Sequence, residues 1–181
     1  VKQLKEQLRF IHGLEREGQL NRELEFIPSD DEISDRVASD RGLTRPELSV
    51  LIAYGKMVLK DELNIPDITD NPYHGRLLIS AFPEVLRQKF QSHMQQHPLR
   101  SEIIATKLTN NMVNDMGLNF VFRLQEETGA SVQEIADAYA IVHGIFNMDD
   151  LWSQIENLDN VIDAKLQLHM LDEARRIMRR A

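Results

Sequence analysis

The sequence predicts an all-α fold, a compact bundle of about eight or nine helices with no sheet. Apolar residues recur at three- and four-residue spacings along most of the 181 residues, which places them on one face of each helix. Alternation with a period of two does not extend beyond a few residues, and no Asn-Gly or Asp-Gly pair offers a tight hairpin turn. Capping boxes at Thr44 to Glu47 and Ser131 to Glu134 mark two helix starts. We expect residues 1–181 to form a single helical domain.

The first third of the chain is expected to hold three helices. Leu4, Leu8, Ile11 and Leu14 share one face of the first helix, and Ser29 or Asp30 can cap the second, whose acidic residues suit a helix start. These helices cover about residues 2–18, 29–40 and 44–63, with an irregular stretch at 20–28.

Gly55 lies on the apolar stripe of the third expected helix. A glycine in a helix interior costs about 1 kcal/mol relative to alanine. We interpret it as a point where a neighbouring helix approaches closely.

Prolines and glycines divide the rest of the chain. Residues 64–72 are expected to be a loop, and Val85, Leu86, Phe90 and Met94 are expected to point inward from the helix that Pro83 opens. The helix after Ser131 is apolar on more than one side, which predicts a central position. The expected helices cover about residues 73–82, 83–97, 99–116, 120–127, 131–146, 149–158 and 160 to the end.

Composition excludes several functional classes. The chain has 29 acidic and 21 basic residues, a net charge of −8, so its field repels phosphate backbones and we expect no nucleic-acid partner. It has no cysteine, which removes disulfides, thiolate metal sites and cysteine nucleophiles. No apolar run approaches the ~20 residues that span a bilayer, and no signal peptide opens the chain. We expect a cytoplasmic protein with no membrane partner.

The sequence offers no catalytic, cofactor-binding or metal-binding residues that we can name. The eight glycines are scattered singly, without a dinucleotide-binding or phosphate-binding loop. His93 and His97 have the spacing of metal ligands, but Met94 occupies the acidic position of the usual motif and no third ligand is evident. We interpret them as polar residues near a helix end.

Three polar groups allow more than one interpretation. Asn110 and Asn114 lie one turn apart in an apolar helix. Their amides either form a buried network of hydrogen bonds within the protein or form a polar patch that binds a small ligand, and we favour the buried network. The acidic run from Asp30 to Asp35 is expected to be a solvated helix start. The chain ends in a basic tail formed by Arg175, Arg176, Arg179 and Arg180. This tail either stabilises a helix end, contacts nucleic acid or docks on an acidic surface of a longer protein, and we favour the stabilising role.

The two ends suggest a fragment of a longer chain. Residue 1 is Val rather than Met, and the last segment keeps a helical pattern with no Gly, Asn or Pro to end it.

Ser131 to Ala136 could open a helix-turn-helix, but the apolar segment that follows and the acidic field argue against DNA binding.

Several segments, in the right order over nearly the whole chain, carry a resemblance to a known family. They are Leu24 to Pro28; Gly42 to Leu48; Leu99 to Thr106; Asn110, Val113, Asn114, Gly117 and Phe120; Glu126 to Ala130; and Leu151, Trp152, Ile155, Glu156 and Leu158 to Asn160. Together they resemble the C-terminal helical region of the large bacterial NAD-specific glutamate dehydrogenases. The chain departs at Ser101, where the family often has a second arginine, and this departure removes one expected salt bridge.

The resemblance implies a parent enzyme that oxidatively deaminates L-glutamate with NAD and forms large homo-oligomers. Its catalytic lysine and dinucleotide site lie upstream on an α/β domain, so no catalytic residue is carried over to this chain. The resemblance therefore implies a non-catalytic accessory domain that packs on the catalytic domain of the same chain or on another subunit. The alternative is an allosteric module that binds a metabolite at the Asn110 and Asn114 face.

Overall fold

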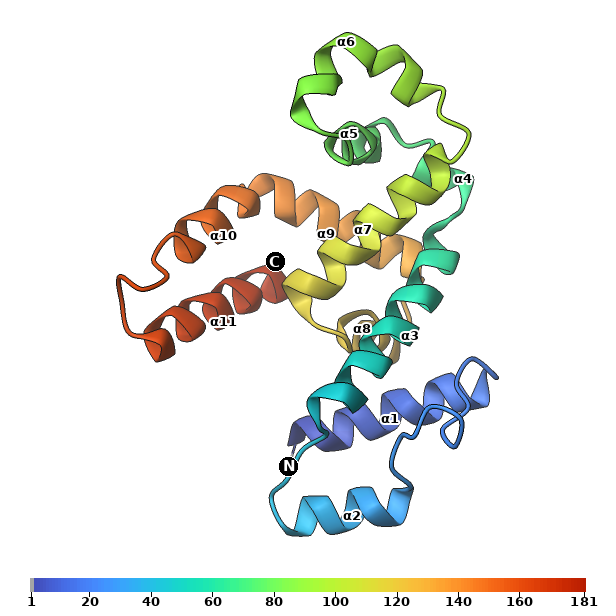
Figure 1. Ribbon diagram of the computed structural model, residues 1–181, viewed down its shortest axis with the longest axis vertical. Coiled ribbons are helices and arrows are strands. Elements are labelled where there is room, and N and C mark those ends of the chain that lie inside the picture. Colours follow the sequence, from blue (N-terminus) through green and yellow to red (C-terminus); the bar gives the residue numbers. More distant parts are fainter. Residues whose placement is uncertain (1) are drawn as a thin grey trace. The chain divides into compact units, whose positions relative to one another are not determined.

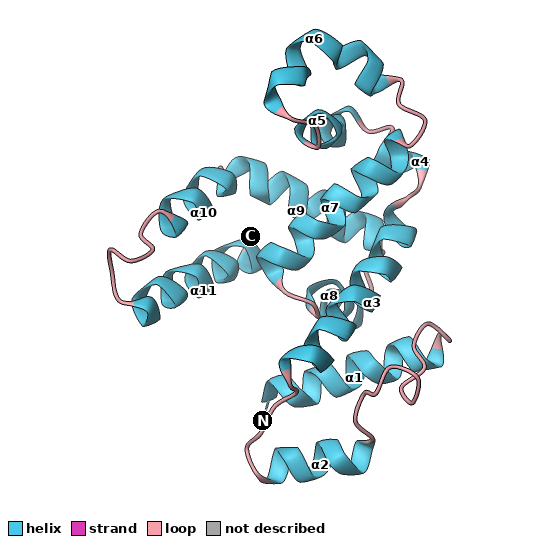
Figure 2. Cartoon of the chain, viewed as in Figure 1, coloured by secondary structure: helices cyan, strands magenta, loops and turns pink. Residues whose placement is uncertain are grey.

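The computed structural model describes residues 2–181, which form eleven helices and no strand (Figures 1 and 2). The predicted all-α class is confirmed, and the predicted count of eight or nine helices is too low. The chain divides into two compact units, with the boundary in the sequence between Val132 and Gln133.

Eight helices form the first unit, and most of them begin where the sequence supplies a cap or a proline. Ser29 and Thr44 accept the backbone N–H of Glu32 and Glu47, whose carboxylates accept the Ser29 and Thr44 N–H in return at 2.8 and 2.6 Å. The bounds are α1 (Lys2–Arg16), α2 (Asp30–Ala38), α3 (Arg45–Leu63), α4 (Pro66–Thr69), α5 (Pro72–Ser80), α6 (Glu84–Gln95), α7 (Arg100–Met116) and α8 (Phe120–Thr128).

Helix α7 is the central element of the first unit. It packs against α3, α4, α5 and α8, and its Ile104, Ala105, Leu108 and Met112 are almost completely buried. A second part of the core forms where α1 packs on α2 and α3, with Ile11, Ile33 and Leu51 at its centre. The predicted apolar faces of these helices therefore do face neighbours.

Gly55 confirms the predicted close approach. A Cβ at this position would lie 2.5 Å from Leu118 Cδ1 and 3.1 Å from Phe10 Cζ. The absence of a side chain on α3 thus lets α1 and the α7–α8 connection pack against it.

Two local predictions are wrong. Residues 64–72 contain the short helix α4, because Pro66 occupies its first turn, where a proline's missing N–H is not needed. Helix α6 buries only Met94, while Val85 is 85% exposed and Leu86 and Phe90 are 39% and 38% exposed. The helix is kinked at Phe90 and packs mainly against α5, so little protein surface is available to cover its apolar residues.

The second unit contains α9 (Val132–Ile145), α10 (Met148–Glu156) and α11 (Ala164–Arg180). Helix α11 packs against α10, and Gln167 Nε2 donates to the Ile155 carbonyl at 2.9 Å. Ile135, Ala136 and Tyr139 are buried, but Ile141 and Ile145 are exposed, so α9 is not enclosed on all sides as the predicted central position requires. None of the described helices is long and apolar enough to span a bilayer.

Candidate functional site

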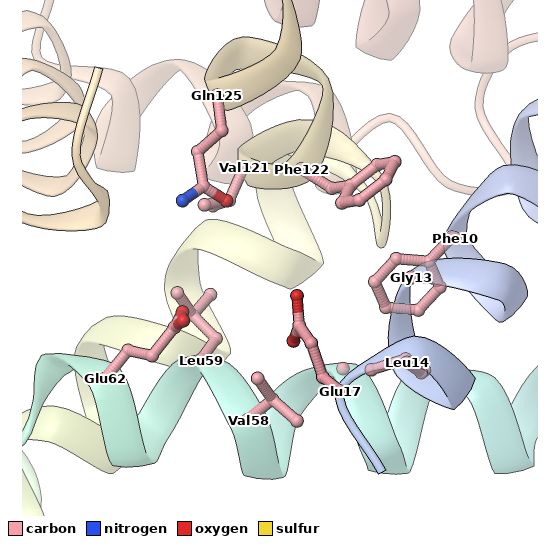
Figure 3. A pocket seen from close by; sticks show the side chains of 11 residues that line it. Phe10, Gly13, Leu14, Glu17, Val58, Leu59, Glu62, Val121, Phe122 and Gln125 are labelled. Atoms are coloured by element: carbon pink, nitrogen blue, oxygen red, sulfur yellow. The ribbon is translucent and has the colours of Figure 1, made fainter. Parts of the chain in front are cut away.

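A cavity of about 100 Å³ lies in the first unit between α1, α3 and α8 (Figure 3). Each helix contributes its facing side: α1 the segment from Phe10 to Glu17, α3 the stretch from Gly55 to Glu62, and α8 its first turns. The lining residues are Phe10, Gly13, Leu14, Glu17, Gly55, Val58, Leu59, Glu62, Val121, Phe122 and Gln125.

Aromatic packing and two glycines form the apolar wall. The rings of Phe10 and Phe122 meet edge to face, with centroids 5.8 Å apart and planes at 76°. A Cβ on Gly13 would lie 3.0 Å from Phe122 Cε2, so the glycine lets this ring lie against α1. Small residues on two helices therefore fix the position of the aromatic pair beside the cavity.

Two carboxylates lie at the mouth of the cavity. Glu62 projects from the end of α3 and Glu17 follows the last residue of α1, and Figure 3 shows both directed into the space between α3 and α8. Within residues 2–181, neither carboxylate forms a side-chain hydrogen bond or an ion pair. The mouth is thus negatively charged, and its charge is not neutralised by a neighbouring cation.

The electrostatic consequence is visible at Glu62. Burial raises the pKa of its carboxyl group, and the nearby charge of Glu17 raises it further. Solvent reaches much of the Glu62 side chain and screens part of this repulsion. The arrangement combines apolar contact area with negative charge, which suits binding of a cation better than nucleophilic or phosphate chemistry.

Comparison with known proteins places the chain in a family. Residues 40–181 match the family described as "Glutamate dehydrogenase, C-terminal". The chain belongs to this family. The resemblance inferred from the ordered sequence segments is therefore confirmed.

The relatives are much longer than this chain. It is 45% identical over 173 residues to the NAD-specific glutamate dehydrogenase of Pseudomonas aeruginosa and 44% identical over 173 residues to that of Halomonas elongata, which covers 96% of this chain in each case. The enzyme of Mycobacterium tuberculosis is 34% identical over 164 residues, or 90% of this chain. The chain spans only 10–11% of the length of these relatives.

Asn110 and Asn114 on α7, the polar pair singled out from the sequence of this glutamate dehydrogenase segment, do not line the cavity. Asn114 is exposed, and its Oδ1 accepts a hydrogen bond of 2.9 Å from Lys56 Nζ on α3. Asn110 is half-buried. Asn114 thus links two helices at the surface and does not belong to a buried network.

His93 and His97 do not share one regular helix. His93 is exposed on α6, while His97 lies beyond the end of α6 and its Nδ1 accepts the Leu99 N–H at 3.1 Å. No group of three or more metal-binding side chains is found in the described part of the chain.

The basic tail lies on α11 and pairs within that helix. Arg175 forms an ion pair of 3.1 Å with Asp172, and Arg176 pairs with Glu173, in each case three residues earlier. These pairs fit the interpretation in which the arginines stabilise the end of the helix.

Sequence reasoning missed both clusters of charge in the first unit. Asp30, expected to be a solvated helix start, accepts a hydrogen bond of 2.6 Å from Arg22 Nη1 and lies 3.0 Å from His12 Nε2. Glu17 and Glu62 meet only through the packing of α1 on α3, and no local motif marks them. The sequence signal that could have pointed to the cavity was a pair of glycines at apolar helix positions, Gly13 and Gly55.

Proposed function

We propose that this chain is the C-terminal helical accessory domain of an NAD-dependent glutamate dehydrogenase and that it serves assembly instead of chemistry. The parent reaction converts L-glutamate, NAD and water to 2-oxoglutarate, ammonia and NADH. The family match and the names of the relatives support the identity of the parent. In this proposal NAD and the catalytic residues belong to the rest of the cytoplasmic enzyme, and no catalytic, cofactor-binding or metal-binding residue is assigned here.

Exposed apolar side chains in the second unit carry the assembly role. On α9, Ile141 is 55% and Ile145 is 72% exposed, and they lie one turn apart on the same face. On α11, Leu166 and Ile177 are about half exposed and, at three turns' separation, also share a face. Large apolar patches on a soluble protein commonly mark interaction surfaces.

Two partners fit this surface in the proposal. One is the catalytic domain of the same chain, and the other is a second subunit of a homo-oligomer. Both would cover apolar side chains that water now contacts, at a gain of roughly 25 cal/mol for each Å² of apolar area buried.

The test uses the full-length enzyme with a charge placed in this surface. Ile145→Glu should disrupt assembly, seen as a smaller particle by light scattering together with lower turnover, because a carboxylate cannot be buried there without a partner. Ser153→Glu, an exposed position on α10, is the matched control and should change neither. Unchanged particle size and unchanged turnover for Ile145→Glu, and also for deletion of the second unit, would refute the structural role.

If the domain instead has an allosteric role, the structure favours the cavity over the Asn110 and Asn114 face as the place where a ligand binds. The Asn110 and Asn114 face offers an exposed amide that is already bonded to Lys56. The cavity of Figure 3 has a volume of about 100 Å³, apolar walls and two carboxylates without an ion pair in the described part of the chain. A ligand-sensing role is therefore better supported at the cavity.

A further inference from the structure

We propose that the cavity between α1, α3 and α8 binds a small organic cation, an ammonium group carried on a short branched apolar body. This inference concerns the first unit alone and does not depend on the assembly role of the second. It rests on three properties of the cavity: its charge, its walls and its size.

The charge at the mouth favours a positively charged ligand. Glu17 and Glu62 face the same space, and none of the lining residues is basic. Two like charges close together repel each other, and the partial desolvation of Glu62 makes its ionised form less favourable still. An ammonium group between the carboxylates would remove the repulsion and form charge-assisted hydrogen bonds with both.

The walls select an organic cation over a metal ion. Calcium and magnesium need six or more oxygen ligands, whereas this cavity places its two carboxylates beside Leu14, Val58 and Val121. An alkyl group would bury apolar area against these side chains and against the Phe122 ring, whose face also attracts a cation.

The size limits the apolar body. A cavity of roughly 150 Å³ lined by aliphatic and aromatic side chains can hold benzene. The present cavity, at about 100 Å³, suits a shorter branched group of roughly four carbons. Isobutylammonium has this shape, and isobutanol and isobutyrate repeat it without charge and with the opposite charge.

The experiment titrates these three compounds into the full 181-residue chain, with calorimetry for affinity and the ¹³C methyl signals of Val58 and Leu59 for location. Isobutylammonium should bind and shift both sets of methyl signals, isobutanol should bind at least about tenfold more weakly, and isobutyrate should not bind. Equal binding of the alcohol and the ammonium, no binding of the ammonium, or shifts confined to other methyl groups would each overturn the proposal.

Variants then test the carboxylates. Glu62→Gln and, separately, Glu17→Gln should each weaken isobutylammonium binding about tenfold, because each removes one charged acceptor. Glu126→Gln makes the same charge change at an exposed position of α8 outside the cavity and should leave the affinity unchanged. If all three variants bind like the parent chain, the carboxylates do not hold the ligand and the proposal fails.

An ammonium group on an apolar chain can belong to a free amine or to a lysine side chain elsewhere in the parent enzyme. Repeating the titration on the full-length enzyme separates the two sources. Binding of isobutylammonium there shows that the cavity stays open to a free amine, whereas binding to the 181-residue chain alone shows that another part of the enzyme fills it, as an internal lysine would.

Discussion

Glu15 and Glu17 leave the C-terminal end of α1 two residues apart, yet they enter opposite environments. Glu15 lies in the last turn of α1, whereas Glu17 is the first residue beyond the helix. Glu15 accepts a hydrogen bond of 2.9 Å from Arg22 Nε in a cluster that also contains Asp30 and His12. Glu17 faces the cavity and Glu62, and its carboxylate forms no ion pair within the described part of the chain.

The pKa shifts of Asp30, in the Arg22 cluster, and of Glu62, at the cavity, have opposite directions. Hydrogen bonds from Arg22 and then from His12 lower the pKa of Asp30. Burial and then the charge of Glu17 raise the pKa of Glu62. The partner at the end of the side chain, and not the residue type or its helix, therefore decides whether an acidic residue stabilises this fold.

The largest expected effect comes from removing the cation of the Arg22 cluster. Arg22 is largely buried, and it bridges Glu15, Asp30 and the Pro28 carbonyl. Arg22→Ala should lower the free energy of unfolding by about 2 kcal/mol, because it leaves these acceptors without their donor. Urea denaturation measures the change. Arg9→Gln, at an exposed position of α1, is the control. A loss no larger than that of the control would contradict the bridging role.

A smaller effect is expected at the wall of the cavity. Gly55→Ala should destabilise the chain by about 1 kcal/mol, because the strain against Leu118 and Phe10 exceeds the gain in helix propensity. Gly75→Ala, on α5, meets nothing within 4 Å and should instead stabilise the chain by up to about 1 kcal/mol. Thermal unfolding compares the pair, and the same sign for both would show that close packing at Gly55 is not the constraint.

Neutralising one carboxylate at the cavity should have the opposite sign to Arg22→Ala. Glu62→Gln should raise the free energy of unfolding at neutral pH by about 0.5 kcal/mol, a modest gain because water screens a partly exposed charge. Glu126→Gln serves as the charge-matched control. Destabilisation by Glu62→Gln alone would mean that the ionised carboxylate has a favourable partner.

The smallest effects are the opposite pH dependences of the two clusters. The raised pKa of Glu62 means that its contribution to stability is present at low pH and is lost as the pH rises through that pKa. The lowered pKa of Asp30 means that its contribution is present above the ordinary aspartate pKa and is lost as the pH falls through the lowered value. Unfolding of Glu62→Gln and Asp30→Asn relative to the parent chain between about pH 3 and pH 7 tests both signs.

Much of the helical framework could be predicted from the sequence because its signals are local. Apolar periodicity located α1, α3 and α7, and the capping residues Ser29 and Thr44 located the starts of α2 and α3. The same reasoning failed for α6, where the period was present but no neighbouring element covered Val85. Periodicity predicts which side of a helix is apolar, but it does not tell whether anything packs there.

The candidate site could not be predicted because it depends on contacts between distant segments. Glu17 and Glu62 lie far apart in the sequence, and each resembles an ordinary surface glutamate. Only the close packing of α1 on α3, made possible at Gly55, brings them to one cavity. Asp30 lies exposed in the first turn of α2 as predicted, but its ion pair with Arg22 was not foreseen, since Arg22 lies in an irregular segment without a recognisable pattern.

An NMR titration of the Glu62 carboxyl carbon tests the account most directly, because unneutralised charge at the cavity underlies both the stability predictions and the proposed ligand. The account predicts a pKa above the ordinary glutamate value that falls when Glu17 is replaced by Gln and falls again when isobutylammonium is added. A pKa at or below the ordinary value that neither change moves would contradict it.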